Sequence, residues 1–138
     1  MVANSALLAE HFGILSMPEF AASPEITPAQ SILTVSGEGV AAIKTWGIKV
    51  SKNSELLTHI RSETMVRDKT CKNALRCLVP ATGYFYRALR KTYFVDLGSP
   101  VFAFAGLIGR RVALLTCVTN RKLAKIHDRM PVILQRTD

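Results

Sequence analysis

Short, mostly apolar runs recur along the chain between polar and turn residues, a pattern typical of β-strands. The runs are rich in β-branched and aromatic residues, and glycine or proline separates them. The pattern predicts strands over residues 31–35, 40–48, 76–87, 91–97, 101–108, 111–119 and 131–134. Residues 36–39 read as a hairpin turn, and strand breaks are expected at Pro80 and Gly83.

Helical periodicity is confined to short segments. It predicts helices over residues 5–12, 66–75 and 120–128. Ser5 and Asn120 are placed to cap the first and last helices, and Gly13 to end the first. Residues 49–64 are polar without a clear period and are predicted to form a loop. We therefore predict an α+β fold, a single domain over residues 1–138 with a curved, barrel-like antiparallel β-sheet and a few short helices.

Composition is that of a globular protein. Of the 138 residues, 49% are hydrophobic and 20% are charged. No apolar run approaches the roughly 20 residues that a membrane span needs. The N-terminal residues lack the basic region and the continuous apolar stretch of a secretory signal. We expect a cytoplasmic monomer with no membrane partner.

The three cysteines and three histidines are scattered along the chain. Cys71, Cys77 and Cys117 have no C-x-x-C spacing, which argues against a disulfide framework and against a zinc site. Cys77 and Cys117 lie in apolar strands and are expected to be buried structural thiols. We predict no metal and no cofactor.

Charge narrows the choice of partner. Eighteen Lys and Arg against ten Asp and Glu give a formal net charge of +8. Such an excess favours a polyanionic partner, with nucleic acid ahead of an anionic membrane. An ordinary solvated basic surface is the alternative, because the basic residues are spread along the chain.

Segment 126–131 (Ile-His-Asp-Arg-Met-Pro) and Trp46 are the first candidates for chemistry. His127 beside Asp128 can act as an acid or base near neutral pH, and Arg129 can hold a phosphate through two N–H groups. The alternative is a capped turn in which His127 satisfies backbone groups. Trp46 ends a strand, where it can stack on an unpaired base or serve as a core residue.

Several motifs follow one another in a fixed order. They are Trp46-Gly47, RSET (61–64), RCLVPATGYFY (76–86), FAFAGL (102–107) and IHDRMPVIL (126–134). In this order they resemble the SRAP family, the abasic-site-processing proteins also called SOS-response-associated peptidases. The resemblance extends over about residues 7–134.

The resemblance implies a protein of the DNA damage (SOS) response that binds single-stranded DNA at an abasic site. In the family, removal of the initiator methionine exposes a cysteine, which closes a thiazolidine ring on the sugar aldehyde and cross-links protein to DNA. Autopeptidase and lyase activities are also associated with the family. An asparagine orients the sugar, an arginine holds phosphate, and a glutamate and a histidine move protons.

This chain departs from that chemistry at three positions. Val2 stands at the position of the cysteine, His59 at that of the asparagine and Tyr86 at that of the glutamate. The matching residues that are retained are Arg61, His127 and Arg129. The family also continues beyond the H-D-R-M-P motif, so we expect a chain shortened at its C-terminus.

The leading hypothesis is therefore a module that binds abasic single-stranded DNA and has impaired cross-linking chemistry. Arg61, Arg129 and Trp46 are the predicted DNA contacts, and His127 is the retained catalytic residue. One alternative is a weak abasic-site lyase, in which the Val2 amine forms a Schiff base with the aldehyde. The other is a protein-interaction domain that has lost DNA. Whether the chain is an enzyme stays open at this point.

Overall fold

The computed structural model of the protein describes residues 5–19, 25–49, 55–63, 74–88, 90–96, 98, 101–119 and 129–134. Its elements in chain order are α1 (Ser5–Phe12), β1 (Ser31–Ser36), η1 (Gly37–Gly39), β2 (Val40–Trp46), β3 (His59–Arg61), β4 (Leu75–Ala81), β5 (Tyr84–Ala88), β6 (Lys91–Val95), β7 (Phe102–Ile108), β8 (Arg111–Val118), β9 (Arg129–Pro131) and β10 (Ile133–Leu134). The strands predicted at β1, β2, β6, β7 and β8 are confirmed, with ends shifted by a residue or two.

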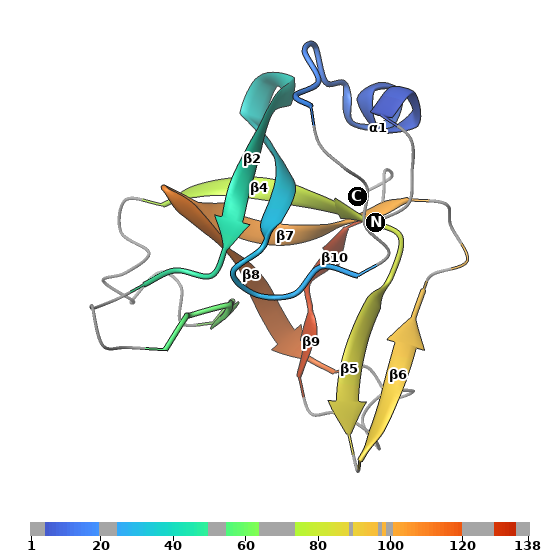
Figure 1. The fold of residues 1–138 in the computed structure, drawn as a ribbon, viewed down its shortest axis with the longest axis vertical. Coiled ribbons are helices and arrows are strands. Elements are labelled where there is room, and N and C mark those ends of the chain that lie inside the picture. Colours follow the sequence, from blue (N-terminus) through green and yellow to red (C-terminus); the bar gives the residue numbers. More distant parts are fainter. Residues whose placement is uncertain are drawn as a thin grey trace.

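Five strands pair in a ring-like order. β7 pairs with β4, β4 with β1, β1 with β2, β2 with β8, and β8 again with β7. The longest ladder joins β4 to β7, from Leu75 opposite Ile108 to Ala81 opposite Phe102. β10 extends this sheet at β7, and β9 pairs with β8. The predicted α+β fold with a curved, barrel-like sheet is confirmed (Figure 1).

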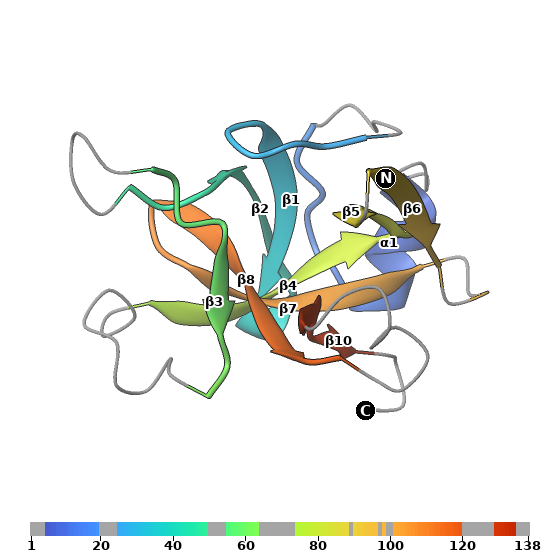
Figure 2. The same ribbon diagram turned by 90° about the horizontal axis from the view of Figure 1, so that it is seen from below.

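β3 corrects two of the predictions. Residues 49–64 were predicted to be a loop, but His59–Arg61 form a strand that lies parallel beside β8 (Figure 2). β2 also pairs with β8 in parallel, so the sheet is mixed rather than wholly antiparallel. β3 has one buried residue, Ile60, between two exposed ones, which is too short an alternation to recognise in a sequence. Its strand geometry depends on β8, because two backbone hydrogen bonds extend the pairing at the ends of β3. Ser62 N–H donates to the Thr116 carbonyl, and Leu114 N–H donates to the Thr58 carbonyl.

Pro80 does not break its strand, contrary to the prediction. β4 runs through Pro80, which lies opposite Ala103 of β7. β1 pairs with β4 only at Leu78 and Cys77, so Pro80 lies where β4 has β7 as its one neighbour among the described strands. A proline is tolerated there because its missing N–H leaves no ladder bond unmade. The break expected at Gly83 is confirmed, since Gly83 separates β4 from β5.

The helix α1 packs against strand β1. Leu8 is fully buried against Leu33 of β1 and Val101, in a cluster separate from the barrel interior. Gly13 ends the helix with φ +63°, as predicted. Helix α1 begins at Ser5 itself, so the cap position falls on residue 4, outside the described residues. The barrel interior is filled by Ile32, Cys77, Val79, Ala81, Phe102, Phe104, Ile108, Val112 and Leu114.

The two other predicted helices fall mainly outside the described residues. The helix predicted over 120–128 does so entirely, as does the one over 66–75 up to residue 73, and Leu75 opens β4 instead. The last predicted strand, 131–134, is present as the short strands β9 and β10. Among the residues that the structure describes, no helix is long and apolar enough to cross a membrane.

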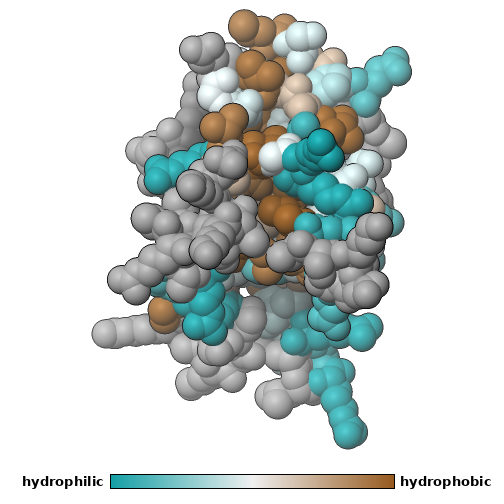
Figure 3. Space-filling view, turned by 90° about the vertical axis from the view of Figure 1, so that its left-hand side faces the viewer, coloured by the Kyte–Doolittle hydropathy of each residue, from teal (hydrophilic) through white to brown (hydrophobic). Residues whose placement is uncertain are grey.

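Apolar side chains also reach the surface away from the core. On the face in Figure 3, hydrophobic side chains form a band that hydrophilic ones flank. Residues of β2 are only partly buried, and Val40, Leu75 and Val118 are mostly exposed. Exposed apolar residues are therefore not confined to one part of this protein, and exposure by itself does not mark a site.

Candidate nucleic-acid interface

The hairpin of β5 and β6 extends from the barrel on the side away from α1 (Figure 1). Its strands pair with each other from Tyr84 opposite Val95 to Ala88 opposite Lys91. The Tyr84 ring contacts Phe104 of the core edge to face, with 5.8 Å between centroids. This contact anchors the base of the hairpin to the barrel interior.

A cavity of about 370 Å³ lies between the hairpin and the barrel. Strands β3, β5, β8 and β9 line it, with the residues His59, Arg61, Tyr84, Phe85, Tyr86, Thr116, Arg129, Met130 and Pro131. Four residues that the sequence analysis singled out therefore border one hollow, namely His59, Arg61, Tyr86 and Arg129. Their segments are far apart along the chain, and the pairing of β3 and β9 on either side of β8 brings them together.

Trp46 lies at a neighbouring cavity of about 250 Å³, which shares His59, Tyr84, Phe85 and Pro131 with the first. Its ring is half-buried against the core, and its indole N–H donates a hydrogen bond to the Thr58 carbonyl, 3.1 Å away. His59 contacts it edge to face at 5.8 Å. Of the two roles considered for Trp46, core packing is the one that these contacts support.

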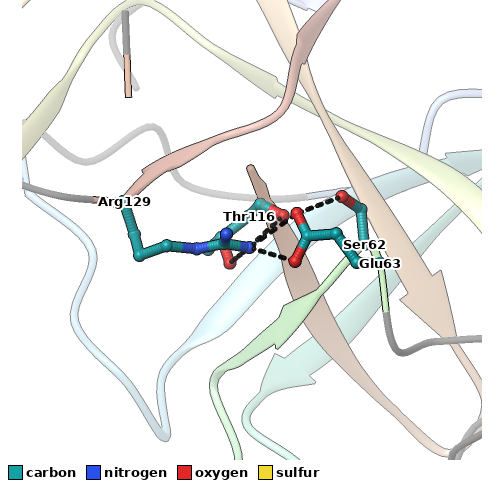
Figure 4. A network of polar contacts seen from close by, with 4 residues as sticks. All are labelled: Ser62, Glu63, Thr116 and Arg129. Carbon is teal, nitrogen blue, oxygen red and sulfur yellow. Dashed lines mark hydrogen bonds and ion pairs between the residues drawn. The ribbon is translucent and has the colours of Figure 1, made fainter. Parts of the chain in front are cut away.

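Arg129 is held by internal partners (Figure 4). Its Nη2 donates to Glu63 Oε1 and Oε2 at 3.1 and 3.0 Å, and to the backbone carbonyl and hydroxyl of Thr116 at 2.9 and 3.1 Å. Only 17% of the Arg129 side chain is exposed, against 50% for Glu63. The ion pair links β9 to the end of β3 across β8 through this one nitrogen, whereas Nε of Arg129 is buried without a hydrogen-bond partner among the described residues.

Glu63 is a residue that sequence reasoning missed, although the RSET motif contains it. The hydrogen bond from Arg129 is the main reason why the pKa of Glu63 lies below its ordinary value of 4.5. Ser62 Oγ donates a further hydrogen bond to Glu63 Oε1 at 3.3 Å. Glu63 is therefore ionised at neutral pH and partly neutralises the cavity wall at Arg129.

Tyr84 is the second residue that was missed. Its hydroxyl is buried and has no hydrogen-bond partner among the described residues. Burial raises the pKa of this phenol, and the nearby Tyr86 and Cys117 add smaller contributions. Tyr86, at the position where the family has a glutamate, stacks on Tyr93 of β6 with centroids 5.4 Å apart and planes 19° apart.

The remaining predicted residues are not all placed. Val2, Cys71 and His127 lie outside the described residues. Cys77 is buried as predicted, and burial raises its pKa to about 12, while Cys117 is only half-buried. The part of the chain that is described brings no three metal-ligating side chains together.

The ring-like sheet and its hairpin belong to a chain of the SRAP class. The profile of that family, described as SOS response associated peptidase (SRAP), matches residues 1–138, and the chain belongs to this family.

Two curated relatives carry related names. The abasic site processing protein YoqW of Bacillus subtilis (strain 168) is 27% identical, over 84% of this chain and 64% of its own length. The abasic site processing protein YobE of the same organism is also 27% identical, over 84% of this chain and 65% of its own length. The chain thus spans just under two thirds of these relatives.

Solved structures have the same fold. A phage-related protein from Bordetella bronchiseptica superposes with a TM-score of 0.66 at 25% identity, over 94% of this chain and 73% of its own. A protein from Bacteroides thetaiotaomicron superposes with a TM-score of 0.66 at 21% identity, over 79% of this chain and 60% of its own. At 21% identity, the second likeness concerns the fold alone.

Proposed function

We propose that the protein binds single-stranded DNA at abasic sites, in the cavity between the β5–β6 hairpin and strands β3, β8 and β9. The convergence of His59, Arg61 and Tyr86 on this one cavity carries the proposal. Family membership and the names of the relatives support an abasic-site, DNA-related function. The net charge of +8 suits a polyanionic partner.

The two cavity arginines have different roles in this proposal. Arg61 is exposed at the end of β3 and supplies positive charge for a phosphate. Arg129 is mostly buried and ion-paired with Glu63, so it shapes the cavity wall and fixes the end of β3. A phosphate would have to compete with Glu63 for Arg129. We propose Arg61 as a phosphate contact because its side chain is exposed at the cavity.

Binding of this kind needs no covalent bond. A thiazolidine requires the thiol and the α-amine of one N-terminal cysteine, and the described cysteines, Cys77 and Cys117, are internal. Cys77 cannot replace that thiol, since it is buried and its pKa is raised to about 12. We propose a non-covalent complex at the cavity that the described residues form. The alternative is a reversible imine that requires prior removal of Met1: the free Val2 α-amine then bonds to the aldehyde carbon, and the carbonyl oxygen leaves as water with the two amine hydrogens.

Electrophoresis with single-stranded DNA that carries one abasic site tests the proposal. We expect a shift in a native gel that weakens with salt, and no shift in a denaturing gel. An intact single strand and a duplex of the same sequence are the matched controls and should bind more weakly. Failure to shift the abasic strand would refute the proposal and favour a protein-interaction domain.

The denaturing gel separates the covalent outcomes. An adduct that survives heat and denaturant without a reductant would contradict the non-covalent complex and indicate chemistry of the thiazolidine type. An adduct that appears only after borohydride treatment would establish the imine, and with it the lyase alternative.

A further inference from the structure

Two phenylalanines form an exposed aromatic pair on the β5–β6 hairpin. Phe85 of β5 lies directly opposite Phe94 of β6, and their rings are 4.9 Å apart between centroids with a tilt of 48°. The two residues are 47% and 53% exposed. Large apolar rings that contact each other in solvent leave much hydrophobic surface uncovered, which favours a ligand over them.

The pair has a defined position. A Cβ placed on Gly83 would overlap the ring of Phe94. The ring can therefore pack in this position only because Gly83 has no side chain. Phe85 lines both cavities described above. The aromatic pair therefore lies at the border of the candidate site, where a ligand in the cavity would contact it.

The surroundings of the pair are basic. Arg87 lies two residues beyond Phe85 on β5, which places it on the same face of the hairpin. Arg90 and Lys91 lie at the turn, and all three cations are exposed. Segment 84–96 contains a single acidic residue, Asp96, at its far end. Aromatic rings among exposed cations are the combination by which proteins bind single-stranded nucleic acid, since every base offers a face for stacking.

We infer that Phe85 and Phe94 form a stacking platform for an unpaired base next to the abasic nucleotide. The inference rests on the proposed function, because the platform borders the cavity assigned to the lesion. Arg87, Arg90 and Lys91 follow the phosphates of the same strand. A second copy of this chain also carries a net charge of +8 and would be repelled by the cluster of cations, whereas the phosphates of DNA are attracted to it.

Two DNA probes test the platform. The first is a single strand with one tetrahydrofuran abasic analogue between ordinary nucleotides. In the second, the nucleotides on both sides of that analogue are also tetrahydrofuran, which removes the bases and keeps every phosphate. We expect the protein to bind the second probe roughly tenfold more weakly, the typical effect of losing base–aromatic stacking.

Phe94→Ala should make the two probes equal, at the weaker level of the second probe. Phe94→Trp should restore the difference, and Phe94→Leu, which keeps apolar bulk without a ring, should not. Leu75→Ala removes an exposed apolar side chain outside the hairpin and serves as the matched control with parental behaviour. Thermal unfolding of each variant checks that the fold is retained.

Each further result decides between the proposals. If the parent binds both probes equally well, the platform is refuted while binding of abasic DNA stands. If the parent binds neither probe, both proposals fail together. If size-exclusion chromatography shows a dimer that Phe94→Ala and Phe94→Leu convert to a monomer, the pair is a contact between copies and the platform is refuted. The comparison of probes on the unmodified protein decides the matter even if a variant does not fold.

Discussion

Arg129 and the β5–β6 hairpin border the same cavity, yet their charges are arranged in opposite ways. The charge of Arg129 is mostly buried and is paired with Glu63. On the hairpin, Arg87, Arg90 and Lys91 are exposed, beside two exposed aromatic rings. A cationic residue at a cavity is therefore not by itself a ligand contact. One region uses its charge to join strands, and the other keeps its charge accessible to an anion.

The largest expected effect is a loss of stability caused by a substitution at the point where the hairpin joins the core. Tyr84→Ala removes the contact with Phe104 and should lower the free energy of unfolding by about 2 kcal/mol, less than for a fully buried aromatic residue. Tyr84→Phe is the control, because it keeps the ring and removes a buried hydroxyl that has no hydrogen-bond partner among the described residues. Its stability should equal or exceed that of the parent. Urea unfolding measures both, and equal losses would show that the hydroxyl is needed.

Arg129→Ala should be the next largest change and should act on stability more than on DNA. It removes the link between β9 and the end of β3 and leaves the Thr116 carbonyl with one donor fewer. We expect the Tm to fall by a few degrees, while the salt slope of DNA binding stays close to that of the parent. Arg129→Lys keeps the charge but not the forked geometry, and should recover only part of the Tm. A normal Tm with a reduced salt slope would instead make Arg129 a phosphate contact.

Arg61→Ala should show the reverse behaviour. The side chain is exposed, so the Tm should change little. If Arg61 neutralises one phosphate, its loss should make the slope of log K for DNA binding against log salt shallower by about 0.7. Fluorescence anisotropy over a salt series measures this slope. An unchanged slope would remove Arg61 from the interface and leave the hairpin cations as the main phosphate contacts.

The smallest effect concerns the pH dependence of Glu63. Its pKa is lower in the folded protein than its ordinary value of 4.5, so its pairing stabilises the fold above that pH. This stabilisation is lost as the pH falls through the lowered pKa. The difference in Tm between the parent and Glu63→Gln should therefore be present at neutral pH and vanish in strong acid. Because Glu63 is half exposed, the difference should also shrink with added salt. A difference that does not depend on pH would show that the pair contributes through shape rather than charge.

The fold could be predicted from sequence wherever the residues of a strand are by themselves enough to identify it as a strand. β1, β6, β7 and β8 are short, mostly apolar runs between turn residues, so the local pattern sufficed to predict them. β3 and the strand through Pro80 were predicted wrongly because both depend on a neighbour. A strand of three residues is defined by the hydrogen bonds of β8, and a proline is tolerated only because one side of β4 is unpaired there.

For the candidate site too, the sequence was enough to predict some features, while others depended on the tertiary structure. The order of motifs along the chain was enough to single out His59, Arg61, Tyr86 and Arg129, because residue types at matching positions can be read directly. Only the tertiary structure decided that these side chains line one cavity, and that Arg129 pairs with Glu63, 66 positions away. It also decided that Trp46 packs on the core and that Phe85 and Phe94 meet in solvent. Residue identity is a property of the chain, whereas burial and pairing depend on which distant strands lie side by side.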